Sequence, residues 1–146
     1  MCSDPNFADP DFSRVVLDTN ILLDAFVFDD PTTRPLKSAL AAHQLEWIAT
    51  KPMRDELVRV LSYPKIVPRM LFYQVSAAHV LAQFDGQATL VDTAPKAGVT
   101  CRDPDDQMFI DLAVSHRSLL LSRDQAVLCM HKRLRTLSVQ VQPAIL

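Results

Sequence analysis

Four acidic residues in this chain stand where an apolar segment ends or where a helix turns its buried face inward. Asp18 follows the apolar run VVL, and Asp124 follows the segment LLLSR. Glu56 and Asp106 each lie three or four residues from apolar positions, a spacing that places them at the buried side of a helix. Clustered carboxylates repel one another unless a cation or protons neutralise them. Such oxygen ligands suit Mg²⁺ or Mn²⁺, ions that can activate water and stabilise an in-line phosphoryl displacement.

Each of these acids also has a purely structural interpretation. Asp18 and Asp124 precede helical segments, where an aspartate caps the helix by accepting backbone N–H bonds. Glu56 can reach water from the edge of its helix. The helix dipole favours acids in a first turn, and this applies to both Asp105 and Asp106. Asp105 also lies close enough to the buried stripe to be a second candidate for the role of Asp106. It is the set of four acids, more than any single one, that favours a metal site.

The elements that must position these acids alternate between strands and helices. This alternation predicts an α/β fold built from βαβ units, with a parallel sheet covered on both faces. Ligands bind such sheets beyond the carboxyl ends of the strands, where Asp18 and Asp124 are expected. Strands are expected at Arg14–Leu17, Leu45–Ala49, Ala88–Asp92, Leu119–Leu121 and Val139–Val141. Helices are expected at Thr19–Phe26, Leu36–His43, Thr50–Ser62, Met70–Phe84, Asp103–His116 and Gln125–Arg135.

The composition limits the classes of function. A chain of 146 residues suits one domain, expected here over residues 14–146 after a flexible lead-in at residues 1–13. With 15 basic and 17 acidic residues, the net charge of −2 speaks against a protein that binds polyanions by charge alone. Only two glycines occur, which excludes the glycine-rich loops that cradle nucleotide phosphates.

The cysteines and the first residues of the chain indicate in which cellular compartment the protein is expected. Cys2, Cys101 and Cys129 are scattered and form no C-x-x-C pair, so neither a disulfide framework nor a structural zinc site is expected. A reducing cytoplasm is the simplest interpretation. The first residues lack the pattern of a signal peptide, and no apolar run is long enough to span a membrane.

Four sequence blocks carry a resemblance to a known family. They are VVLDTNILLDAF, RDELVRVL, CRDPDDQMFIDLA and LLLSRD, and together they span Val15–Asp124. In order and spacing they resemble the PIN-domain ribonucleases, most closely the toxin components of bacterial toxin–antitoxin systems. The resemblance implies a three-layer α/β/α sandwich with a central parallel sheet. It also implies a Mg²⁺- or Mn²⁺-dependent endoribonuclease, a hydrolase of RNA phosphodiester bonds.

The resemblance assigns roles to the four acids. Asp18, Asp106 and Asp124 would hold one or two divalent ions. Glu56 would be a further ligand, directly or through water. These four are therefore the expected catalytic and metal-binding residues, and the implied mechanism is metal-assisted hydrolysis.

Further residues are expected to support this site. Asn20 would orient Asp18 or a water at the metal, and Ser122 keeps a hydroxyl where the family often has threonine. Asp105 is expected beside the ligands. Weak RNA-binding roles are expected for basic residues adjacent to the site blocks: Lys51, Arg54, Arg102 and Arg123. The basic run HKRLR is more simply interpreted as a solvated helix face.

The expected partners are an RNA substrate, a cognate antitoxin protein and a second copy of the chain, with no membrane. Met70–Phe84 is apolar enough to contribute a surface to a homodimer. Two alternatives stay open. One is a catalytically silent PIN-like module that binds RNA or protein. The other is a phosphatase on a related sheet, although the usual D-x-D is absent because Asn20 stands two residues after Asp18.

Overall fold

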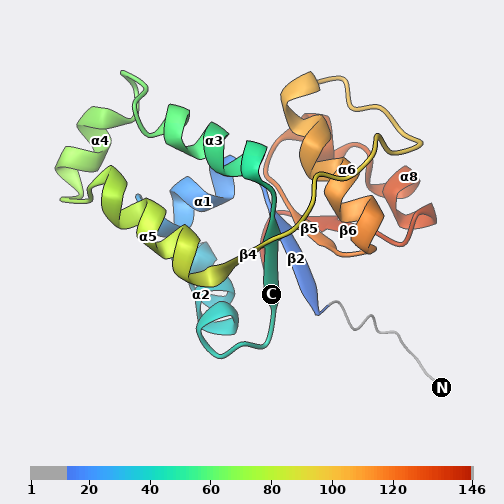
Figure 1. Cartoon of the computed structure of the whole chain (residues 1–146), viewed down its shortest axis with the longest axis horizontal. Helices are drawn as coiled ribbons and strands as arrows, with labels where there is room; N and C mark the ends of the chain where they lie inside the picture. The colour runs from blue at the N-terminus through green and yellow to red at the C-terminus, as the bar shows by residue number, and fades with distance from the viewer. Residues whose placement is uncertain (1–12, 146) are drawn as a thin grey trace.

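The computed structural model describes residues 13–145, so all but the last residue of the expected lead-in lies outside the described part of the chain. One sheet of parallel strands forms the centre, in the order β4-β3-β2-β5-β6 (Figure 1). The expected strands are found with small shifts at their ends. They are β2 (Arg14–Leu17), β3 (Glu46–Ala49), β4 (Ala88–Leu90), β5 (Leu119–Leu121) and β6 (Gln140–Gln142).

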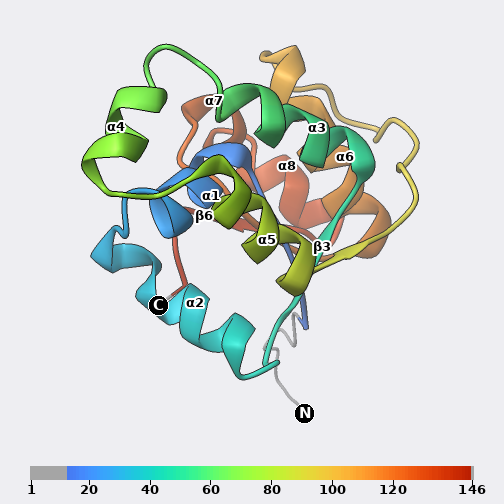
Figure 2. The same ribbon diagram turned by 60° about the vertical axis from the view of Figure 1, so that its left-hand side comes forward.

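Helices cover both faces of this sheet, which confirms the expected α/β/α sandwich. Helices α1 to α5 lie on one face and α6 to α8 on the other, as Figures 1 and 2 show. Between residues 13 and 145, none of the helices is long and apolar enough to cross a membrane. The α-helices are α1 (Thr19–Phe26), α2 (Arg34–Ala41), α3 (Lys51–Val60), α4 (Val67–Phe72), α5 (Ala77–Gln87), α6 (Gln107–His116), α7 (Gln125–Leu128) and α8 (His131–Thr136). Two 3₁₀ turns, η1 (Pro31–Thr33) and η2 (Pro104–Asp106), precede α2 and α6.

The central strands are apolar because both of their faces are covered. In β2 the sequence is RVVL and in β5 it is LLL, and every residue of these strands except Arg14 is buried. On the α1–α5 side, the ring of Trp47 stacks on Phe26 at 5.9 Å and meets the edge of Phe84 at 5.1 Å between ring centroids. This packing fixes the helices against the sheet and so fixes the strand ends from which the site is built.

The expectation of one helix over Met70–Phe84 is wrong. The chain forms α4 and α5, separated by a turn in which Gln74 has a left-handed backbone with φ of 57°. Ser76 then caps α5, because its side chain accepts the backbone N–H of His79. The apolar spacing continues across the turn since Met70, Val80 and Phe84 all reach the core, and this continuity hid the break.

The expected helix over Gln125–Arg135 is also interrupted. Helix α7 ends at Leu128, and Met130 has a non-helical ψ of 6° before α8 begins. Val127, Met130 and Leu134 are all buried, and their spacing of three and four residues is that of one helix face. The apolar spacing therefore continues across the break, which is why it predicted one uninterrupted helix.

Candidate metal centre

The pairing of β2 with β5 brings the first parts of the site together. Leu17 pairs with Leu121 at the carboxyl ends of these strands, and the backbone N–H of Asp18 donates to the carbonyl of Leu121 at 3.2 Å. Asp18 and Ser122 are therefore neighbours at the edge of the sheet. Asp124 follows two residues later as the N-cap of α7.

Asp18 is 3% exposed and caps α1. Its Oδ1 accepts the backbone N–H of Ile21 at 3.0 Å. Burial raises the pKa of the Asp18 carboxyl, the Ser122 hydroxyl and the Ile21 N–H oppose this, and the charge of Asp124 adds to it. The capping interpretation is thus correct for one oxygen of Asp18, and it leaves the carboxylate close to the other acids.

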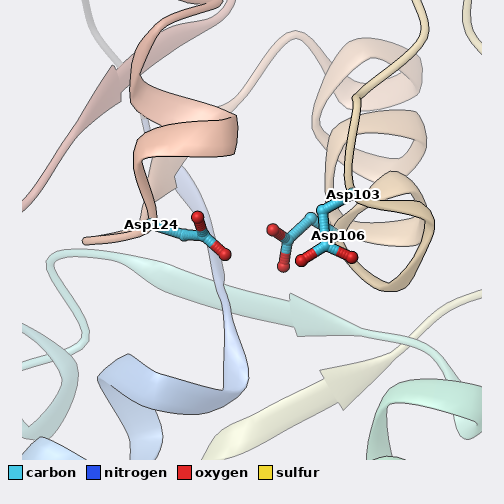
Figure 3. Close-up of side chains that lie close together, drawn as sticks. All are labelled: Asp103, Asp106 and Asp124. Atoms are coloured by element: carbon cyan, nitrogen blue, oxygen red, sulfur yellow. The ribbon is translucent and has the colours of Figure 1, made fainter.

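Three carboxylates meet beside Asp18. Asp103, Asp106 and Asp124 each offer one oxygen, and these oxygens all lie within 4.8 Å of one another (Figure 3). Asp103 caps η2 and Asp106 ends it, so one short turn supplies two of the three. Cys101, which precedes η2, contacts α7, because its Sγ donates a hydrogen bond to the carbonyl of Ala126 at 3.2 Å. The two segments that carry the cluster are thereby joined directly.

Asp106 has the most perturbed electrostatics of the cluster. It is 9% exposed, and its Oδ2 has no hydrogen-bond partner among the described residues. Burial, followed by the hydrogen bond and the charge of Asp124, raises the pKa of Asp106 to about 8. The same hydrogen bond lowers the pKa of Asp124. These opposite shifts favour one proton shared by the two carboxylates, in a place where a cation could neutralise both instead.

Glu56 approaches from α3 and stands apart from this three-oxygen cluster. Its Oε2 is buried and has no hydrogen-bond partner among residues 13–145. Burial raises the pKa of Glu56, the Thr19 hydroxyl lowers it, and the charges of Asp105 and Asp18 raise it further. Asp18 is thus the acid that links Glu56 to the cluster, since its charge also acts on Asp106.

The residues expected to support the site divide into two groups. Ser122 is fully buried, and its Oγ accepts the backbone N–H of Asp124 at 3.1 Å, so it lies between Asp18 and Asp124. Asn20 is exposed, and within the described chain no hydrogen bond joins its side chain to Asp18. Asp105 is exposed as well, and its side chain is not part of the cluster.

Asp103, expected only as the first residue of the helix Asp103–His116, was not among the expected site residues. It does cap η2, because its Oδ1 accepts the backbone N–H of Asp105 at 3.0 Å. A capping aspartate uses one oxygen for this bond and has a second one free to face a neighbour. The available signal was the D-x-x-D spacing of Asp103 and Asp106, which sets both acids at the ends of a single turn.

This donor set suits a hard divalent cation. All its ligand atoms are carboxylate oxygens, the Oδ2 of Asp106 is buried without a partner among the described residues, and like charges make the arrangement costly unless a proton or a cation is present. Asp103, Asp106 and Asp124 are placed to hold the ion, with Asp18 adjacent.

Most of the basic residues expected to bind RNA are engaged by acids. Lys51 pairs with Asp55 at 3.2 Å, and Arg54 pairs with Asp85 at 2.8 Å. Among the four expected residues and within residues 13–145, Arg102 is the one without an ion pair.

Arg123 is the centre of a network that links distant segments. Its guanidinium donates to Asp24 at 2.8 Å, to Asp30 at 3.0 Å and to the Thr32 hydroxyl, and its Nε to the carbonyl of Pro143 at 3.4 Å. Burial raises the pKa of Asp24, and the charge of Arg123 partly opposes this. These contacts hold the segment between Ser122 and Asp124 against α1 and η1.

We expect Arg123→Met to lower the free energy of unfolding by about 1–3 kcal/mol, because hydrogen bonds to charged groups contribute on that scale. Urea unfolding measures this change. The control is Arg102→Met, an exposed residue whose replacement should change stability by less than about 0.5 kcal/mol. If Arg123→Met unfolds like wild type but binds RNA more weakly, the guanidinium serves RNA, as the sequence first indicated.

Comparison with known proteins adds family information. The family model described as PIN domain matches residues 14–126. The fold also matches a chain in the crystal structure of VapBC2 from Rickettsia felis bound to a DNA fragment from their promoter, with a TM-score of 0.58 and 15% identity. That match covers 88% of this chain and 98% of the other. No curated protein matches this chain significantly in sequence.

Proposed function

Since the chain belongs to the PIN domain family, which consists generally of nucleases, we propose that it is a metal-dependent endoribonuclease. The observation that carries the proposal is the partly buried acidic cluster at the carboxyl end of the sheet. Three carboxylate oxygens lie within 4.8 Å of one another there, and the Oδ2 of Asp106 is buried without a hydrogen-bond partner. Because an unpaired buried carboxylate is costly, this arrangement is best explained by a ligand that neutralises it.

In the proposed reaction, Mg²⁺ or Mn²⁺ held by Asp103, Asp106 and Asp124 would activate water and offset the charge that develops on the phosphoryl oxygens. Asp106 would give up the proton it shares with Asp124 in order to hold the cation. Ser122 keeps Asp124 in place through the backbone N–H that its hydroxyl accepts. The Oε2 of Glu56 has no hydrogen-bond partner among the described residues, and Glu56 lies close enough to Asp18 to feel its charge. Glu56 is therefore suited to accept a hydrogen bond from the attacking water.

The proposal includes a role as the toxin of a toxin–antitoxin pair in the cytoplasm. Support comes from the fold likeness to a chain in the crystal structure of VapBC2, which is bound to a DNA fragment from their promoter. By analogy, a cognate antitoxin protein would bind this chain and silence it.

Exposed apolar side chains around α4 support a protein partner. Leu71 is 74% exposed and Phe72 is 80% exposed, with Val67 and Tyr73 beside them. Such a surface is more apolar than a solvated helix needs to be. The homodimer expected from Met70–Phe84 would use the same surface, and light scattering at high concentration measures whether it forms.

Removing the metal is expected to abolish cleavage. A mixed RNA pool is incubated with the protein in Mn²⁺, in chelator, and in chelator followed by excess Mn²⁺. Cleavage should occur in Mn²⁺, stop in chelator and return on re-addition, because the acids repel phosphate unless a cation lies between them.

The control is Asp18→Asn purified in parallel, which detects a contaminating ribonuclease. Equal cleavage by this variant and wild type, or cleavage that persists in chelator, would contradict the proposal. Single-stranded DNA of the same sequences forms a further arm, and preferential cleavage of DNA would contradict the assignment of RNA as substrate.

A further inference from the structure

A cavity of about 380 Å³ adjoins the acidic cluster on the side of Glu56. Its walls come from α3 with the turn that follows it, and from η2 with the start of α6. Figures 1 and 2 show α3 and α6 side by side at this end of the molecule. Asp103 caps η2 and Asp106 ends it, so the cavity and the cluster share this one short turn. The lining residues are Glu56, Arg59, Tyr63, Pro104, Asp105 and Met108.

Two of these side chains, an aromatic ring and a guanidinium, are of types that Mg²⁺ and Mn²⁺ do not prefer as ligands. Tyr63 is 48% exposed and offers an aromatic ring to a flat ligand. Arg59 is exposed, lies three residues after Glu56 on the same helix face, and forms no ion pair within residues 13–145. The earlier cations of this helix, Lys51 and Arg54, are both paired with acids. Arg59 is thus the cation of this helix that lines the cavity without an ion pair among the described residues, and its charge lowers the pKa of Glu56 on the same wall.

An aromatic ring beside a free guanidinium fits a nucleotide. Aromatic side chains stack on nucleobases, and guanidinium groups bind phosphate through two parallel hydrogen bonds. Met108 and Pro104 add apolar wall to the same cavity. The acids Glu56 and Asp105 repel a phosphate on their side, so the phosphate is expected at Arg59 and the base against Tyr63.

We propose that this cavity is a subsite for one nucleotide of single-stranded RNA, adjacent to the phosphate that is cleaved. The inference rests on the proposed ribonuclease function and specifies how its substrate is held. Stacking is available to every base, so the subsite is expected to hold the strand in position rather than to select a sequence.

The test measures the binding of a fluorescein-labelled single-stranded RNA decamer by fluorescence anisotropy in Ca²⁺, with intact RNA verified on a gel. Tyr63→Leu should weaken binding about tenfold, because one stacked base is lost. Tyr63→Phe keeps the ring and should bind within about twofold of wild type. Arg59→Gln should weaken binding and reduce the slope of log affinity against log salt by about 0.7, the value for one phosphate contact on a single strand.

Matched controls are Tyr73→Leu, an exposed tyrosine after α4, and Arg133→Gln, an exposed arginine on α8. Neither should change the affinity or the salt slope by as much as its counterpart. Wild-type affinity in Tyr63→Leu and Arg59→Gln, equal losses in the controls, or an absence of RNA binding by wild type would each overturn the subsite. RNA binding that depends on Tyr63 and Arg59, without cleavage in Mn²⁺, would support the subsite and contradict the ribonuclease.

Discussion

Asp106→Asn is expected to lower Mn²⁺-dependent RNA cleavage at least about 100-fold, since even residues that only support metal ligands contribute about 10–100-fold. Asp106 is the most buried member of the acidic cluster, and its Oδ2 has no other partner among the described residues. Asparagine keeps the shape of the side chain but removes the charge that holds a cation. Initial rates of RNA cleavage in saturating Mn²⁺ measure the effect.

Asp105→Asn is the matched control, because it makes the same chemical change one residue earlier. Asp105 is exposed and lies outside the cluster, so its variant should keep cleavage within about tenfold of wild type. The sequence alone left both residues as candidates. A larger loss in Asp105→Asn than in Asp106→Asn would assign the ligand to Asp105 and contradict the cluster as described.

The second large effect concerns stability without metal. The pKa of Asp106 in the folded protein is raised to about 8 from 3.8. A raised folded pKa means that the protonated form stabilises the fold. This stabilisation is complete below the unfolded pKa near 4 and is lost as pH rises through the folded pKa near 8. Asp106→Asn cannot ionise, and its amide can still donate to Asp124.

We therefore expect Asp106→Asn in chelator to be more stable than wild type at pH 7 by about 1 kcal/mol or more, the free energy of one pKa unit. The difference should grow from pH 5 to pH 8. Excess Mn²⁺ should stabilise wild type, by about 2.7 kcal/mol at 100 times the dissociation constant, and stabilise the variant less. Melting curves in chelator and in Mn²⁺ decide this. A variant that is less stable in chelator and gains as much from Mn²⁺ would leave Asp106 with a structural role at the helix end.

Local sequence patterns predicted the parts of the fold that local chemistry determines. The strand Arg14–Leu17 and the helix Thr19–Phe26 are found as expected, because a short apolar run and a capping aspartate define their ends. The break between α4 and α5 and the turn at Met130 were missed. In both places the buried apolar residues keep a helical spacing across the break, so periodicity alone did not reveal it.

In the site, too, local spacing predicted some features and contacts between distant segments determine others. The spacing of Asp106 from Phe109 and Ile110 indicated its buried side, and the structure places it there. The contacts of Arg123 with Asp24 and Asp30 join residues more than 90 positions apart, so adjacency in sequence to Asp124 suggested RNA instead. The sequence left capping and metal binding as alternatives for Asp18 and Asp124. The structure shows why they are compatible, since a capping carboxylate has a second oxygen.

Calorimetric titration of metal-free protein with Mn²⁺ at pH 7 tests the acidic cluster as a metal centre most directly. The proton shared by Asp106 and Asp124 must leave when the cation binds, so the titration is repeated in two buffers of different ionisation enthalpy. We predict saturable binding by wild type, release of about one proton for each cluster filled, and affinity at least about tenfold weaker in Asp106→Asn. Two results would contradict the metal centre. One is wild type that shows no saturable binding of Mn²⁺. The other is wild type that binds Mn²⁺ with the same affinity as Asp106→Asn and releases no proton.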